Sequence, residues 1–232
     1  MKISIVIPVY NEKNNISILL NKIYKILKNN AFEIIVIDDS STDGTNKVLK
    51  KLKKKYSNLN IILRQGKERD LSRSCAEGFV RARFDKIVVM DGDLQHDPKY
   101  IPKMINKFHK NNCDIVVGAR DLVNKRIRSL SLFRQFSSFM IIKIFDIFFG
   151  KKTIDPMSGF FLFKKKIYTK NKKKLYLKGF KILADLIYSQ KSLKIEDVII
   201  KFNYRVKGKS KLNFKILIIL IKFMFLKFFR II

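Results

Sequence analysis

Tryptophan is absent from this chain of 232 residues, and cysteine, histidine and proline are scarce, with two, two and four residues. The two cysteines, Cys75 and Cys113, do not have the spacing of metal ligands, and we expect both to be buried free thiols in a reducing compartment. The two histidines, His96 and His109, are too few for a histidine-rich metal centre.

Acidic residues are few as well: 19 Asp and Glu stand against 50 Lys and Arg, which gives a formal net charge of +31. Such a charge favours an anionic partner, although a biased genome would also produce a chain rich in Lys, Ile, Asn and Phe. The location of the charge is therefore more informative than its total. Basic residues dominate the second half, where the longest apolar stretches lie, and this combination favours a membrane surface over nucleic acid. The acidic residues after Asp121 are Asp146, Asp155, Asp185, Glu196 and Asp197.

Several common motifs are missing. No G-x-G-x-x-G follows the first strand-like run, residues 3–8, where "PVYNE" stands instead, and this argues against a dinucleotide-binding Rossmann domain. The chain also has no Walker glycine loop and no Ser-His-Asp pattern. Met1 leads directly into the first strand-like run without a signal peptide, so we expect the catalytic part in the cytosol.

Strand-like and helix-like segments alternate along the chain, and 47% hydrophobic residues suffice for a core. Asn15 is expected to cap the first helix, which ends near Leu27, and Ser41 or Thr42 to open the second. Alternation of this kind predicts a parallel sheet covered on both faces, with ligands beyond the carboxyl ends of the strands. The remaining expected strands are the run "FEIIVI", residues 60–63, residues 87–90, the run "CDIVVGAR" and the run "GFFLFK", and the remaining helices are 72–83 and 99–110.

Acidic residues follow two of these strands directly. Asp38 and Asp39 end the second strand, and "VVMDGDLQHDP" places Asp91 and Asp93 at the end of the fourth. Crowded carboxylates repel each other unless a cation compensates them. Oxygen ligands suit Mg²⁺ or Mn²⁺, and such an ion would neutralise a diphosphate leaving group. A lone D-x-D is also compatible with a solvated turn, but its position at a strand end favours the metal site.

Six segments, in this order, resemble glycosyltransferase family 2, and specifically its polyprenol-phosphate (dolichol-phosphate) mannosyltransferase branch: "SIVIPVYNE", "IVIDDSSTDGT", "VVMDGDLQHDP", "VVGAR", "DPMSGF" and "RVKGKSKL". The resemblance extends to about Leu212. It implies an α/β fold of the GT-A type, which is a Rossmann-like nucleotide-sugar-binding domain with a mainly parallel sheet and inverting chemistry. The expected division is a catalytic domain, 1–212, with a membrane-contacting insertion at about 129–149, and a membrane-associated C-terminal helix, 213–232.

The resemblance also implies roles for individual residues. Those matched to the nucleoside pocket are Pro8, Tyr10, Glu12, Ile37 and Asp39. Those matched to the metal and diphosphate segment are Asp91, Gly92, Asp93 and Gln95, with Asp91, Asp93 and Gln95 as metal ligands. Those matched to the grip on the acceptor phosphate are Arg120, Arg134 and Ser138, and Arg120 is also counted among the residues that bind the nucleotide-sugar. Those matched to a basic loop over the donor diphosphate are Arg205 and Lys211. The catalytic set would be Asp91, Asp93, Arg120 and Arg134; a lipid phosphate is already ionised, so no strong general base is required.

Simpler interpretations remain open for some of these residues. Tyr10 would equally suit packing at a strand end, Arg134 would suit a side chain reaching toward lipid headgroups, and His96 would suit a supporting or surface position. Asp155 and Ser158 would suit a turn, and Lys207, Lys209 and Lys211 a solvated surface. Glu68 and Arg69 receive no role. Relatives often have glycine near position 70, where this chain has Asp70, so the loop and the donor preference are expected to differ there.

Two Phe- and Ile-rich stretches, residues 129–149 and 214–232, are candidates for membrane contact. In a helix, Lys215, Lys222, Lys227 and Arg230 would share an arc of about 140° at ~100° per residue. This pattern favours a helix lying in the membrane interface over a spanning or core helix. We therefore expect a peripheral or monotopic protein at the cytoplasmic face of the membrane.

The function expected from the resemblance is metal-dependent transfer of a sugar to a polyprenyl or dolichyl phosphate. Mannose is expected first, then glucose or another hexose, from a donor such as GDP-mannose or a UDP-sugar. A polysaccharide acceptor is the alternative on the same fold, although the Q-x-x-R-W motif usual in processive synthases is missing. A non-catalytic basic protein on a membrane or nucleic acid is a further alternative, but carboxylates at the strand ends do not suit a nucleic-acid groove.

Overall fold

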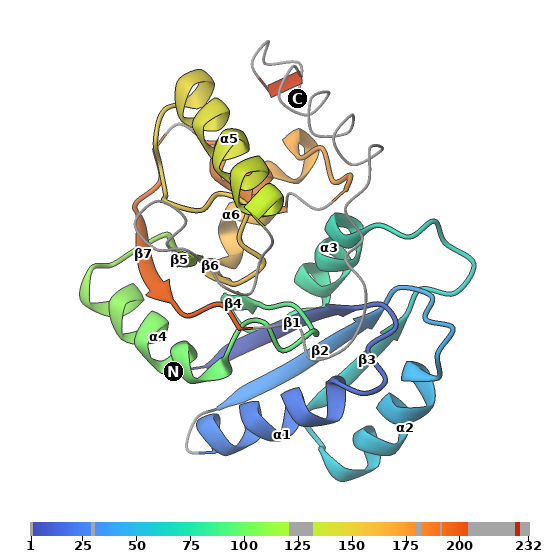
Figure 1. The fold of residues 1–232 in the computed structure, drawn as a ribbon. Helices are drawn as coiled ribbons and strands as arrows, with labels where there is room; N and C mark the ends of the chain where they lie inside the picture. The colour runs from blue at the N-terminus through green and yellow to red at the C-terminus, as the bar shows by residue number, and fades with distance from the viewer. Residues whose placement is uncertain are drawn as a thin grey trace.

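A computed structural model of the chain describes residues 2–28, 31–120, 132–179, 182–190, 192–203 and 226–227 (Figure 1). These residues form a seven-stranded sheet in the order β3-β2-β1-β4-β6-β5-β7, with β6 antiparallel to β4 and β5 and every other pair parallel. The strands are β1 (Ile3–Val9), β2 (Phe32–Asp38), β3 (Leu59–Leu63), β4 (Lys86–Val89), β5 (Ile115–Arg120), β6 (Phe161–Lys164) and β7 (Ile195–Ile200). The helices are α1 (Ile16–Leu27), α2 (Thr45–Lys55), α3 (Leu71–Arg81), α4 (Ile101–Lys110), α5 (Leu132–Phe149), α6 (Lys165–Asn171) and α7 (Ile182–Tyr188), with 3₁₀ turns η1 (Pro98–Tyr100) and η2 (Lys172–Lys174).

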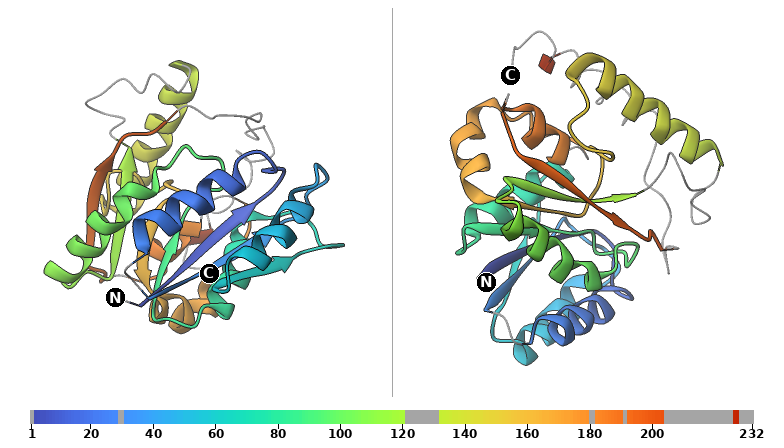
Figure 2. Two further views of the ribbon diagram at one scale, coloured as in Figure 1. Left: turned by 90° about the horizontal axis from the view of Figure 1, so that it is seen from below. Right: turned by 90° about the vertical axis from the view of Figure 1, so that its left-hand side faces the viewer.

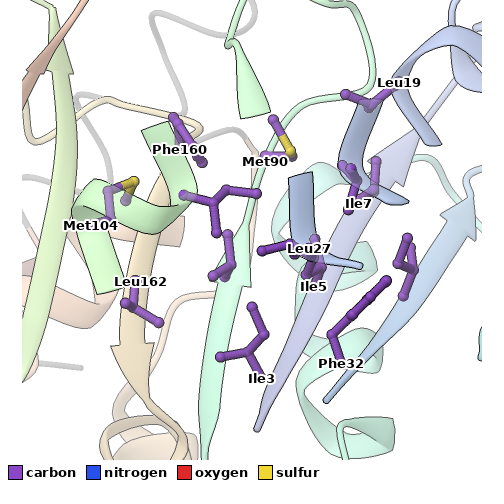
Figure 3. Packing of buried hydrophobic residues seen from close by; sticks show 14 of the residues in the cluster. Ile3, Ile5, Ile7, Leu19, Leu27, Phe32, Met90, Met104, Phe160 and Leu162 are labelled. Atoms are coloured by element: carbon purple, nitrogen blue, oxygen red, sulfur yellow. The ribbon is translucent and has the colours of Figure 1, made fainter. Parts of the chain in front are cut away.

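Helices cover both faces of the sheet, and the side chains of β1 alternate between them (Figures 1 and 2). Ile3, Ile5 and Ile7 lie in the core beneath α1 and α4, and Figure 3 shows them packed with Leu27 and Met90. Val6 points to the opposite core, which α3, α6 and α7 cover. All seven β1 residues are buried because the strand is covered on both sides.

The expected α/β fold with a mainly parallel sheet is confirmed, with β6 as the one described strand that runs antiparallel to its neighbours. Two local expectations are wrong. Asn15 occupies the N-cap position of α1, but its Oδ1 accepts no hydrogen bond from the first turn of the helix, and its amide nitrogen donates to Glu12 Oε2 at 2.7 Å. The second helix begins at Thr45 after Gly44, whose φ of +92° is left-handed, rather than at Ser41 or Thr42.

The described side chains of α5, at residue 140 and residues 142–149, pack against the domain on one side of the helix. Phe145 is fully buried against Ala184 of α7, whereas Met140, Ile147 and Phe148 are exposed. The helix therefore presents apolar side chains outward, within the stretch expected to contact the membrane. None of the described helices is both long and apolar enough to cross a bilayer.

The predicted C-terminal helix, 213–232, lies outside the described residues except for Leu226 and Lys227. Lys227, which the sequence placed on the charged arc of an interfacial helix, has a buried side chain instead. Its Nζ lies 2.9 Å from Asp185 Oδ1 and donates to the carbonyl of Lys174 at 2.8 Å. A carboxylate inside the domain attracts this lysine, and the sequence pattern around residue 227 contains no sign of it.

Candidate active site

The carboxyl ends of β2, β1 and β4 lie side by side, and each is followed by a tight turn. Asn11, Ser40 and Leu94 have φ values of +57°, +63° and +64°, which residues other than glycine rarely adopt. Hydrogen bonds hold the first two turns together, since Asn11 N donates to Ser41 Oγ and Asn11 Oδ1 accepts from Thr42 N, both at 2.8 Å. Strained backbone gathered at three adjacent strand ends is typical of a functional site.

Asp39 is the fixed carboxylate of the predicted nucleoside pocket. It is buried, its Oδ1 pairs with Arg64 Nη1, and its Oδ2 accepts a hydrogen bond from Asp70 N at 2.8 Å. Pro8 and Ile37, also predicted for this pocket, are register partners at the ends of β1 and β2. The structure thus brings three of the five predicted pocket residues to one edge of the sheet.

The other two pocket residues follow β1. The guanidinium of Arg69 lies 4.1 Å from the ring centroid of Tyr10, which is a cation–π contact. Glu12 begins the turn into α1, where its backbone N donates to Thr45 Oγ1 at 2.9 Å. The sequence assigned no role to Arg69, because its contact depends on how the loop after β3 folds over the end of β1.

Asp91, Gly92 and Asp93 leave the end of β4 in close contact with the rest of the domain. A Cβ on Gly92 would lie 2.7 Å from Val9 Cγ1, and a Cβ on Gly159 would lie 2.2 to 2.8 Å from the carboxyl atoms of Asp91. Asp91 therefore lies directly against the "DPMSGF" turn. Asp93 is buried, and its Oδ1 accepts from Gln95 N at 3.1 Å.

Gln95 connects this segment to the chain that follows β7. Its Nε2 donates to the carbonyl of Asn203 at 3.2 Å, and Asn203 N donates to the Gln95 carbonyl at 2.9 Å. Gln95 was predicted as a metal ligand, and its amide nitrogen is committed to Asn203. The residue thus holds the chain just before the predicted basic loop.

Arg120, at the end of β5, forms a two-point ion pair with Asp155. Its Nε and Nη2 lie 2.6 and 2.9 Å from the two carboxylate oxygens, and Asp155 is fully buried. Burial would raise the pKa of Asp155, but the charge and hydrogen bonds of Arg120 outweigh it and hold that pKa below its usual value. Burial would likewise lower the pKa of Arg120, but the charges of Asp155 and Asp91 raise it. Asp155 thus does more than shape a turn, since it also holds the arginine beside the D-x-D segment.

An aromatic cluster joins the D-x-D segment after β4 to Arg120 at the end of β5. The His96 ring lies 5.5 Å from Phe160 and 5.1 Å from Phe202, and its Nε2 is 3.6 Å from Asp91 Oδ2. The guanidinium of Arg120 lies 5.3 Å from the Phe202 ring. The sequence allowed His96 either a supporting position or a surface position. His96 is buried, which excludes the surface position.

Four predicted residues have no described side chain. The backbone of Arg134 and Ser138 belongs to α5, but their side chains are not among those described. Arg205 and Lys211 lie wholly outside the described residues. Of the predicted grip on the acceptor phosphate, only Arg120 is placed.

The carboxylates at the strand ends suit a divalent cation, but they would supply only some of its ligands. Among the described residues, no three His, Cys, Asp or Glu side chains are grouped as a complete metal site. Asp91 and Asp93 would thus supply two oxygen ligands and leave the other positions to water and phosphate, as Mg²⁺ and Mn²⁺ commonly require. Burial raises the pKa of the Cys75 thiol well above its usual value, and the nearby charges of Asp91, Asp70 and Asp39 add to the effect.

Gly159→Ala is expected to lower turnover by about 10- to 100-fold, because the new methyl group would displace the Asp91 carboxylate and small misplacements at a reacting centre are costly. Steady-state assay with the donor tests this. Gly66→Ala is a stringent control: its φ of +72° adds backbone strain that Gly159 does not have, but no atom lies within 4 Å of a new Cβ there. Wild-type turnover in Gly159→Ala would show that the placement of Asp91 does not matter.

Comparison with known proteins agrees with this geometry. The model of the Glycosyl transferase family 2 matches residues 4–171, which include the strand ends described above. The chain belongs to this family. The sequence predicted this family of glycosyltransferases.

Dolichol-phosphate mannosyltransferases are among the similar curated proteins. Dolichol-phosphate mannosyltransferase of Pyrococcus furiosus is 36% identical over 93% of this chain and 60% of its own length. Its namesake from Saccharomyces cerevisiae is 31% identical over 93% of this chain and 82% of its own length. The chain therefore spans less than two thirds of the archaeal relative. The predicted branch of the family is confirmed by these similarities.

Solved structures show the fold. Glucosyl-3-phosphoglycerate synthase from Mycobacterium tuberculosis, in complex with Mn²⁺, UDP and glucosyl-3-phosphoglycerate, has a TM-score of 0.69 at 17% identity, over 97% of this chain and 78% of its own. S. aureus TarS 1-349, in complex with UDP-GlcNAc, has a TM-score of 0.67 at 16% identity, over 98% of this chain and 66% of its own. The GT-A type of fold expected from the sequence is confirmed.

Proposed function

We propose that this protein transfers a sugar, mannose first among the candidates, from a nucleotide-diphosphate sugar to a polyprenyl or dolichyl phosphate at a membrane. The observation that carries the proposal is the buried Arg120–Asp155 pair beside Asp91 at the carboxyl edge of the sheet. A guanidinium fixed at this point suits a phosphate monoester next to the donor diphosphate. The similarity to dolichol-phosphate mannosyltransferases supports the choice of a lipid phosphate.

The residues divide the work of an inverting displacement. An oxygen of the acceptor phosphate forms a bond to the anomeric carbon while the bond from that carbon to the diphosphate breaks on the opposite side. Arg120 orients the acceptor, whose phosphate is already anionic, so no residue has to remove a proton. Asp39 and Tyr10 hold the nucleoside, and Asp91 and Asp93 would hold Mg²⁺ or Mn²⁺. When bound, this cation would neutralise charge on the departing diphosphate.

Transfer of the sugar from its donor to dolichyl phosphate in detergent, with the purified protein and Mn²⁺, tests the function directly. Radiolabelled GDP-mannose is expected to give a lipid-extractable product in which the sugar is joined to phosphate. UDP-glucose and UDP-N-acetylglucosamine serve as competing donors. The lipid-acceptor proposal is wrong if the label moves only to water or to a soluble acceptor.

The outward side of α5 supports docking on the membrane. Met140 and Ile147 are exposed on the side away from Phe145, and the exposed Lys143 lies between them in the helical pattern. Apolar side chains would enter the interface while lysine meets anionic headgroups. We propose that residues 129–149 and 214–232 both make this contact at the cytoplasmic face, and that neither needs to span the bilayer.

Ile147→Glu combined with Phe148→Glu is expected to weaken binding to vesicles containing anionic lipid by at least tenfold. Burial of each side chain is worth roughly 1.5–3 kcal/mol, and ~1.4 kcal/mol corresponds to tenfold. Sedimentation with vesicles measures this. Ile18→Glu is the control, because Ile18 is also an exposed apolar side chain but belongs to α1. Unchanged sedimentation of the double variant would exclude α5 as the docking surface.

A further inference from the structure

Residues 175–179, here called the strap, run between η2 and α7 and are fixed by two carboxylates. Leu177 N donates to Asp185 Oδ2 at 3.0 Å, and Gly179 N donates to Asp70 Oδ2 at 2.7 Å. The Gly179 carbonyl accepts from both the N and the Oγ of Ser72 at 3.0 Å. Leu177 has a φ of +49° and Gly179 of +82°. A leucine in the left-handed region persists only where its surroundings enforce it, so the strap is held in a costly conformation.

Asp70 connects the strap to the nucleoside pocket. Its Oδ1 caps α3 by accepting from Arg73 N at 3.0 Å, and its Oδ2 holds Gly179. Its own N–H donates to Asp39 Oδ2 at 2.8 Å. The carboxylate that binds the strap therefore belongs to the same residue whose backbone fixes Asp39. The connection therefore depends on both the side chain and the backbone of Asp70.

Asp185 connects the strap to the C-terminal segment. Lys227 Nζ lies 2.9 Å from Asp185 Oδ1, and both side chains are at most 3% exposed. The same Nζ donates to the carbonyl of Lys174, immediately before the strap. A buried lysine and carboxylate are strongly unfavourable apart, so the pair fixes residue 227 against α7 and the strap.

We infer that Asp70 and Asp185 are positioning residues for the donor nucleotide, and that the contact of Lys227 with Asp185 is transmitted through the strap to Asp39. The inference rests on the proposed function, because it concerns affinity for the donor. Both carboxylates bind the strap, one at Leu177 and the other at Gly179, and Asp70 also reaches Asp39 through its backbone N–H. Docking of the C-terminal segment at residue 227 thereby sets how firmly the nucleoside pocket is held.

Asp70→Asn separates this role from helix capping. Asparagine is as good an N-cap as aspartate, so its single oxygen retains the hydrogen bond from Arg73. Its amide group then faces Gly179 N–H, which is a donor against a donor, and the strap loses its anchor. Calorimetric binding of GDP and UDP with Mn²⁺ to the full chain is expected to weaken by about tenfold, while the melting temperature stays close to that of the wild type.

Lys227→Gln tests the far end of the same connection. It is also expected to weaken nucleotide binding. The double variant with Asp70→Asn is expected to lose less binding free energy than the sum of the two single losses, because both substitutions act through the strap. In assays of the transfer reaction, KM for the donor is expected to rise while KM for the lipid phosphate stays unchanged. Controls are Glu68→Gln, an exposed carboxylate two residues before Asp70, and Lys173→Gln, an exposed lysine of η2.

The outcomes separate this inference from the function on which it rests. If the wild type binds no nucleoside diphosphate, both are wrong. Suppose that the wild type binds a nucleoside diphosphate and that Asp70→Asn weakens this binding, but that Lys227→Gln binds the nucleotide as the wild type does. The C-terminal segment is then not coupled to the pocket, and the inference is overturned. Effects of the two substitutions that simply add would also overturn it.

Discussion

Asp93→Asn is expected to lower sugar transfer by several orders of magnitude without unfolding the protein. Asparagine keeps the oxygen that accepts the hydrogen bond from Gln95 N, so the turn after β4 retains its main contact. What is lost is one negative charge at the point proposed to hold the divalent cation. Because charge developing on the departing diphosphate is the main electrostatic demand of the reaction, weaker cation binding acts directly on the rate.

Transfer measured over a series of Mn²⁺ concentrations tests this prediction. Excess EDTA should abolish wild-type transfer, and no Mn²⁺ concentration should restore Asp93→Asn fully. Asp97→Asn is the matched control: Asp97 lies in the same segment, and its Oδ1 caps η1 by accepting from Lys99 N at 3.0 Å, a role that asparagine also fills. Full wild-type transfer in EDTA would show that the reaction needs no cation at this site.

The sheet was largely predictable because its strands carry local signals. Short apolar runs ended by acidic or polar residues predicted β1, β2, β3, β4 and β5 close to their observed bounds, and the alternation with helices predicted the parallel core. The direction of β6 was not predictable in this way. A short buried strand such as Phe161–Lys164 has the same composition in either orientation, and its pairing depends on partners far away in the chain.

The site was predictable where one strand end supplies the chemistry, and not where distant segments meet. Asp39 and Asp91 were identified from their positions after apolar runs. The pairing of Arg120 with Asp155, and the stacking of Arg69 on Tyr10, depend on loops that approach each other only in the folded chain. Nothing in the local pattern of residues 213–232 reveals that Lys227 pairs with a carboxylate of α7.

Arg120→Ala is expected to raise the KM for the lipid phosphate by roughly 10- to 150-fold, from the loss of a charge-assisted hydrogen bond worth ~1.5–3 kcal/mol. It should also destabilise the fold by about 3–5 kcal/mol, because it leaves the fully buried Asp155 charged and without its partner. Nucleotide binding should change little, since Tyr10 and Asp39 follow β1 and β2, whereas Arg120 ends β5. Steady-state kinetics with each substrate and urea unfolding at pH 7 measure the two effects. Loss of nucleotide binding with normal use of the lipid phosphate would reverse the assignment of Arg120.

Asp155→Asn separates the charge of Arg120 from its orientation, because the guanidinium remains but loses one arm of its two-point pair. We expect a smaller rise in the acceptor KM than in Arg120→Ala, and partial recovery of stability when the two substitutions are combined, since no buried charge is then left alone.

The pH dependence of this stabilisation has a definite sign. Arg120 holds the pKa of Asp155 below its usual value, so the stabilisation is fully present above about pH 4, the ordinary range of an unfolded aspartate, and is lost as the pH falls through the lower folded pKa. The difference in unfolding free energy between wild type and Asp155→Asn should therefore be constant near neutral pH and shrink below about pH 4. A difference that grows on acidification would mean that Asp155 is not held ionised by Arg120, and the proposed grip on the acceptor phosphate would lose its anchor.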